Sequence, residues 1–128
     1  MIELGKKDAY VGKESKLQES VINYLRYSGY FAIHVPNGGS RNVIEATNLK
    51  KQGVLAGVSD ILIFDNVMDL PSMVIFKGIA IELKVKGRKV SDAQKEFMSN
   101  AEKRGFLVFL AWNLTDLIDY FEKNIRRL

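Results

Sequence analysis

Cysteine is absent from this sequence of 128 residues, and histidine occurs only once. Without cysteine the protein has no disulfides, no thiolate metal site and no cysteine nucleophile. The lone His34 cannot supply a zinc site by itself. The sequence therefore excludes thiol chemistry and structural zinc of the usual kind.

Long apolar runs are absent as well. No run approaches the roughly 18 residues that span a bilayer, and residues 1–7 lack the apolar core of a signal peptide. We therefore expect an intracellular protein that makes no membrane contact. A length of 128 residues suits one compact domain over residues 1–128. The net charge of +4 suits a polyanionic partner, although many small domains carry such a charge for solubility alone.

Apolar periodicity predicts an alternation of helices and strands. Leu17, Val21 and Leu25 fall on one stripe of a first helix, and Gly29 stands where a helix-ending glycine belongs. Helices are predicted over residues 13–28, 44–52, 92–104 and 114–125, and strands over 31–35, 57–64, 79–85 and 106–112. Residues 65–72 are expected to form a polar connection without strands.

This order of elements predicts an α/β fold. Strand–helix–strand crossovers combined with a central hairpin give a mixed β-sheet with helices on both faces.

Two acids and a lysine lie within the apolar runs at 57–64 and 79–85, namely Asp60, Glu82 and Lys84. Buried charges cost several kcal/mol unless something pairs with them. Side chains alternate along a strand, so Glu82 and Lys84 project from the same side. A divalent metal ion held by the two carboxylates, with Lys84 beside it, would meet that need. The alternatives are an ion pair on a solvated edge strand and a turn capped by Asp60.

Glu14 and Gln94 are candidates for the same site. Glu14 lies on the inward stripe of the first predicted helix, and Gln94 lies on the inward stripe of the helix over 92–104. Each has a structural alternative. Glu14 complements the helix dipole in the first turn, and Gln94 forms a capping box with Ser91.

Several polar residues are candidates for nucleic-acid contacts. His34, Asn37 and Arg41 surround a glycine turn whose backbone N–H groups suit a phosphate, although a plain turn would have the same composition. Lys86 and Arg88 border the predicted site and can follow a DNA backbone, although a solvated hairpin edge would look the same.

The order of these motifs resembles the PD-(D/E)xK nucleases. An aspartate, a spacer and then Glu82-Leu83-Lys84 form the core of that pattern, and Val58-Ser59-Asp60 narrows the resemblance to the VRR-Nuc branch. Glu14 to Gln18 matches the Glu-x-x-Leu-Gln context of that family, and Gln94 matches its glutamine in the following helix. The short chain resembles the stand-alone phage or bacterial type.

The resemblance implies a restriction-endonuclease-like core and a metal-dependent DNA endonuclease that hydrolyses phosphodiester bonds. The implied substrates are branched DNA such as Holliday junctions or flaps, and the products carry 5′-phosphate and 3′-hydroxyl ends. It also implies a homodimer in the cytoplasm of a bacterium, or of the host cell of a phage. The implied catalytic residues are Glu14, Asp60, Glu82, Lys84 and Gln94, and Mg²⁺ or Mn²⁺ is held by Glu14, Asp60, Glu82 and the carbonyl of Leu83.

Three other readings of the sequence stay open. A small interaction domain whose acids only form ion pairs would bind no metal. A non-catalytic nucleic-acid-binding module could keep this fold, but it would be free to lose the costly charges of Asp60, Glu82 and Lys84. The last alternative is a restriction-type enzyme that recognises a specific DNA sequence, although no additional recognition element stands out.

Overall fold

The computed structural model describes residues 1–36 and 42–128. Asn37 and Arg41, two of the residues expected to contact nucleic acid, lie outside the described residues. The helices are α1 (Glu14–Tyr27), α2 (Val43–Lys51), α3 (Asp92–Lys103) and α4 (Leu114–Asn124), with a short 3₁₀ helix at Lys6–Asp8. The strands are β1 (Ile2–Leu4), β2 (Ala32–His34), β3 (Ile61–Ile63), β4 (Val67–Asp69), β5 (Val74–Phe76), β6 (Gly78–Leu83), β7 (Phe106–Ala111) and β8 (Ile125–Arg127).

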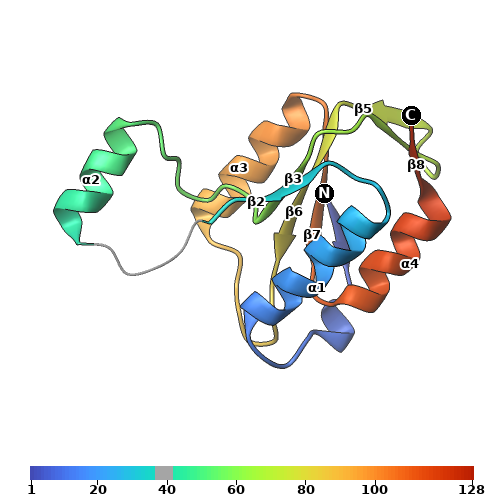
Figure 1. The fold of residues 1–128 in the computed structure, drawn as a ribbon, viewed down its shortest axis with the longest axis horizontal. Coiled ribbons are helices and arrows are strands. Elements are labelled where there is room, and N and C mark those ends of the chain that lie inside the picture. Colours follow the sequence, from blue (N-terminus) through green and yellow to red (C-terminus); the bar gives the residue numbers. More distant parts are fainter. Residues whose placement is uncertain (37–41) are drawn as a thin grey trace.

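A five-stranded mixed sheet forms the centre of the molecule, in the order β1-β7-β6-β3-β2. Strand β6 pairs with β7 in parallel and with β3 in antiparallel orientation. Helices α1 and α4 cover one face of this sheet and α3 covers the other (Figure 1). The predicted α/β fold with helices on both faces is therefore confirmed.

The two faces of the sheet have separate apolar clusters. Leu17, Val21 and Leu25 of α1 pack with alternate residues of the sheet and with α4, as their spacing predicts. On the opposite face Met98 of α3 packs against Ala80 and other sheet residues. Because β6 has neighbours on both sides and is buried along its whole length, its polar residues lie deep in the molecule.

A second sheet replaces the polar connection that the sequence predicts for residues 65–72. Strands β4 and β5 form a hairpin there, and β8 pairs with β4 to give the order β5-β4-β8. The prediction was wrong because this polar segment with Pro71 shows no strand pattern of its own, and β4 forms by pairing with β8 far along the chain. The final helix ends at Asn124, one residue before the predicted end, and the last residues join this small sheet.

Helix α2 stands away from the rest of the fold (Figure 1). None of its nine residues is buried, although all nine are described. In the described part of the chain no helix is long and apolar enough to cross a membrane.

Candidate metal centre

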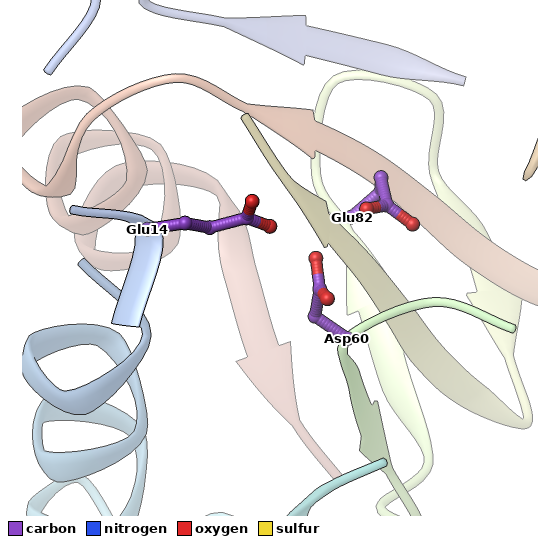
Figure 2. Close-up of side chains that lie close together, drawn as sticks. All are labelled: Glu14, Asp60 and Glu82. Atoms are coloured by element: carbon purple, nitrogen blue, oxygen red, sulfur yellow. The ribbon is translucent and has the colours of Figure 1, made fainter. Parts of the chain in front are cut away.

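Three carboxylates from distant parts of the chain meet at one place. Glu14 begins α1, Asp60 directly precedes β3, and Glu82 lies near the C-terminal end of the central strand β6. One oxygen of each lies within 4.8 Å of the others. Figure 2 shows the three side chains pointing toward a common centre. The structure thus brings together the three acids that the sequence predicts as metal ligands.

Glu14 and Asp60 line a cleft of about 640 Å³, and the buried Glu82 lies within reach of both. Lys84 and Gln94, the two remaining residues of the predicted catalytic set, line the same cleft. So does His34, which comes from the end of β2. Lys86 and Arg88 follow β6 and are exposed, and the charge of Arg88 acts on Glu14. All five residues of the predicted catalytic set therefore lie in or directly beside one cleft.

Hydrogen bonds from the chain segments on either side of it hold Asp60 in place. Its Oδ2 accepts a 2.7 Å hydrogen bond from the backbone N–H of Leu83. Its carbonyl accepts hydrogen bonds from the Val35 N–H at 2.8 Å and from Nδ1 of His34, also at 2.8 Å. Since a carbonyl oxygen only accepts, Nδ1 of His34 carries the proton. The side chain of Leu83 is buried in the apolar cluster, and its carbonyl stays a predicted ligand.

Gly57 allows the Asp60 segment to approach α3 closely. Its φ is +83°, in the left-handed region, and a Cβ placed on it would lie 2.3 Å from the backbone of Ala93. Only glycine combines this conformation with this contact. The turn that carries Asp60 is thereby set against the first turn of α3, which carries Gln94.

Gln94 has two roles at once. Its Oε1 accepts from the Ser91 N–H at 2.9 Å, while Ser91 Oγ accepts from the Gln94 N–H at 3.1 Å, which completes the capping box. Its Nε2 donates to Oε2 of Glu82 at 3.3 Å. The capping role and the site role are therefore not alternatives, because they use opposite ends of one amide.

Lys84 and Glu82 lie side by side in the buried part of the site. Lys84 Nζ lies 3.8 Å from Glu82 Oε2, and the two residues are 7% and 1% exposed. The alternative of a solvated edge strand is wrong, because β6 lies between β3 and β7. Burial raises the pKa of the Glu82 carboxyl to about 9, with further contributions from a hydrogen bond to Asp60 and from the charge of Asp60. Lys84 opposes this shift without cancelling it.

Glu14 is also shifted upward. Burial raises the pKa of its carboxyl, and the negative charge of Asp60 adds to the shift. Lys84, Arg88 and His34 act in the opposite direction. The charge of Asp60 raises the pKa of both Glu14 and Glu82, and a divalent cation would relieve this repulsion.

The donor set fits a hard divalent cation. Three carboxylates converge, and in the described residues Oε1 of Glu82 is buried without a hydrogen-bond partner. Mg²⁺ and Mn²⁺ favour such oxygen ligands. Glu14, Asp60 and Glu82 are the side chains that could hold the ion.

Comparison with known families decides the class of this domain. The family model described as the VRR-NUC domain matches residues 12–112. The chain belongs to the VRR-NUC family. The match spans every residue of the candidate site from Glu14 to Gln94, and the family places the chain among nuclease-type domains.

A solved structure shows the same fold. The structure described as "VRR_NUC domain protein" superposes with a TM-score of 0.68 over 89% of this chain and 88% of that chain, at 22% sequence identity. At this identity the likeness shows the fold alone. No curated protein matches the sequence.

Sequence reasoning did not assign a role to one residue that lines the cleft. Gln18 lies one turn after Glu14 on α1 and lines the cleft with it. The four-residue spacing from Glu14 is the signal that could have identified it, but only the structure shows that its amide nitrogen is buried.

Proposed function

We propose that this protein is a metal-dependent deoxyribonuclease that cuts phosphodiester bonds within DNA. The observation that carries the proposal is the convergence of Glu14, Asp60 and Glu82 at the edge of one cleft, with Lys84 buried against Glu82. A purely structural ion pair would not require three carboxylates within 4.8 Å of one another.

The chemistry assigned to each side chain follows from its position. Glu14, Asp60 and Glu82 would hold one or two Mg²⁺ or Mn²⁺ ions, together with the Leu83 carbonyl. When bound there, the ion would acidify a water, polarise the scissile phosphate and offset charge on the leaving oxygen. Lys84 lines the cleft and can donate to the attacking water or to the phosphate. Gln94 holds Glu82 through its Nε2 and thereby keeps that carboxylate oriented.

We propose branched DNA, such as junctions or flaps, as the preferred substrate. The family resemblance suggests this preference. The net charge of +4 and the exposed Lys86 and Arg88 beside the cleft suit a phosphate backbone. We assign His34 to substrate contact as well, because its ring lines the cleft.

We further propose that two copies act together. Helix α2 offers the surface for this, since Val43 and Ile44 are 81% and 75% exposed and no residue of this fully described helix is buried. An isolated helix of this length is marginal in water, so a partner would stabilise it. An apolar groove of about 660 Å³ lies beside it, between α3 and the segment that follows α2.

Cleavage of end-labelled DNA tests the catalytic proposal. The panel holds single strands, duplex, flaps and an immobile four-way junction, each with Mg²⁺, Mn²⁺ or EDTA. We expect cutting that requires metal and favours the branched substrates. Lys84→Met keeps the aliphatic stem and removes the donor, so the rate should fall on the order of a hundredfold.

Lys123→Met is the matched control. Lys123 lies on α4 and pairs only with Asp119 at an exposed site, so this variant should cut at the wild-type rate. Binding of DNA by the wild type without cutting of any substrate would overturn the proposal and favour a non-catalytic binding module. Cutting at defined sequences in plain duplex would favour the restriction-type alternative.

A further inference from the structure

Buried polar atoms that lack a hydrogen-bond partner are concentrated around the cleft. In residues 1–36 and 42–128 there are three such side-chain atoms: Gln18 Nε2, Ser59 Oγ and Glu82 Oε1. Glu82 is one of the acids, Ser59 directly precedes Asp60, and Gln18 lines the cleft. Unsatisfied groups of this kind are rare in folded proteins, and each needs a specific explanation. Their common location indicates that the site contains unused hydrogen-bonding groups, which acquire partners when the site binds its ligand.

Of these three atoms, Gln18 Nε2 is the one that can only donate a hydrogen bond. Its position on α1 points to a role in the site. It follows Glu14 by four residues on α1, a spacing that places both side chains on the same face of a helix. Both line the cleft. An amide nitrogen can only donate, so the buried Nε2 requires an acceptor, and in the described structure it has none.

A carboxylate that binds an ion usually needs a second partner. Coordination through one oxygen leaves the other oxygen to be held by a neighbouring donor, which fixes the orientation of the ligand. Asp60 has such a donor in the Leu83 N–H, and Glu82 has one in Gln94. Among the described contacts Glu14 has no hydrogen bond of this kind, and the spare donor one turn away on its own helix is Gln18.

We propose that Gln18 is a positioning residue for Glu14. When the site holds its cation, the Gln18 Nε2–H group donates to the free carboxylate oxygen of Glu14 and fixes its rotamer. This inference rests on the proposed function, because it requires a cation at Glu14, Asp60 and Glu82. Without the cation the amide is unsatisfied, so Gln18 lowers the stability of the empty protein and strengthens metal binding.

Replacement of the amide by an apolar side chain of similar size tests this role. In Gln18→Leu the dissociation constant for Mn²⁺, measured by titration calorimetry, should rise about tenfold. The melting temperature in EDTA should stay the same or increase, because the unsatisfied amide is gone. Gln18→Met, which is unbranched like glutamine, is the second variant and should show the same pair of changes. Asn23→Leu, at an exposed amide of α1, is the control and should bind Mn²⁺ like the wild type.

The outcomes separate this inference from the proposed function. Mn²⁺ must first stabilise the wild type and fail to stabilise Asp60→Ala; absence of that difference overturns the proposed function itself. If the wild type binds Mn²⁺ and both Gln18 variants bind it within twofold of the wild-type affinity, only the role of Gln18 is overturned. A fall in the EDTA melting temperature of both variants would show that Gln18 is structural, and would overturn the role equally.

Discussion

The surroundings of Glu82 strongly disfavour the charged form of its carboxyl. It is 1% exposed, lies beside Asp60, and has a pKa raised to about 9 from an ordinary value of 4.5. At neutral pH the folded protein without metal therefore keeps a proton on Glu82 that the unfolded chain releases. Unfolding then releases a proton, so the folded state loses stability as the pH rises between about 4.5 and 9.

This linkage gives a prediction for Glu82→Gln. In EDTA the melting temperature of the wild type should fall as the pH is raised from 5.5 to 8.5, with at most about 1.4 kcal/mol lost per pH unit for one proton. The variant is neutral at every pH, so its melting temperature should depend less on pH. Scanning fluorimetry across this range measures both slopes. Equal slopes would mean that Glu82 is already ionised in the empty protein.

Bound metal should abolish this dependence of the wild-type melting temperature on pH. Binding of a divalent cation requires the ionised carboxylates, so it displaces the proton from Glu82. The stabilisation by Mn²⁺ should therefore increase from pH 6 to pH 8.5. Glu82→Gln should show little Mn²⁺ stabilisation at any pH in that range. A wild-type shift that does not change with pH would contradict the assignment of Glu82 as a ligand.

At this scale the sequence predicted the acids but not their partners. Asp60, Glu82 and Lys84 stood out because charges in apolar runs require compensation. The hydrogen bond from the Leu83 N–H to Asp60 joins residues 23 positions apart, and the bond from Gln94 to Glu82 joins residues 12 apart. No local pattern specifies such pairings, because they depend on how the strands register in the sheet.

Among the elements, the contact between the Asp60 turn and α3 depends on Gly57. Gly57→Ala would place a methyl group 2.3 Å from the Ala93 backbone at a φ of +83°. Either the turn or the start of α3 must shift, which would separate Asp60 from Gln94. We expect a loss of about 3 kcal/mol in the free energy of unfolding and a weaker response to Mn²⁺. Urea denaturation with and without Mn²⁺ measures both.

Gly87→Ala is the matched control for backbone strain. Gly87 has a φ of +89°, but a Cβ there would meet no atom within 4 Å. This variant should therefore lose only about 1 kcal/mol, the cost of the left-handed conformation alone. If Gly57→Ala loses no more free energy of unfolding than Gly87→Ala, the methyl group is accommodated beside α3 and the close contact does not matter for stability.

Elements within a recognisable apolar pattern were predicted well, including the short strands β2 and β3, whereas four other short strands were not. α1, α3, β6 and β7 follow the expected ranges within a few residues, because each buries a stripe or a run against the sheet. Strands β1, β4, β5 and β8 have three residues each and were missed. Their formation depends on pairing with partners far along the chain, β1 with β7 and β4 with β8, rather than on local preference.

For the molecule as a whole, the arrangement of α2 bears on how a branched substrate would be cut. One chain has one group of three acids placed to hold a metal ion in its described residues, so incision of both strands of a junction in one encounter requires a second copy. The exposed apolar residues of α2 provide the contact that we propose. If two copies join in this way, disrupting α2 should abolish paired incision and leave single-strand cutting intact.

Ile44→Asp places a charge in the centre of that proposed contact. Light scattering coupled to size exclusion should give twice the 14.5-kDa chain mass for the wild type and the single chain mass for the variant. The variant should still nick flaps, since α2 contributes no residue to the cleft, but it should lose paired cleavage of the four-way junction. Tyr27→Asp, at a residue 93% exposed on the end of α1, is the control and should remain a dimer. A monomeric wild type that resolves the junction would overturn the proposed pairing, because each incision would then come from a separate encounter with one cleft.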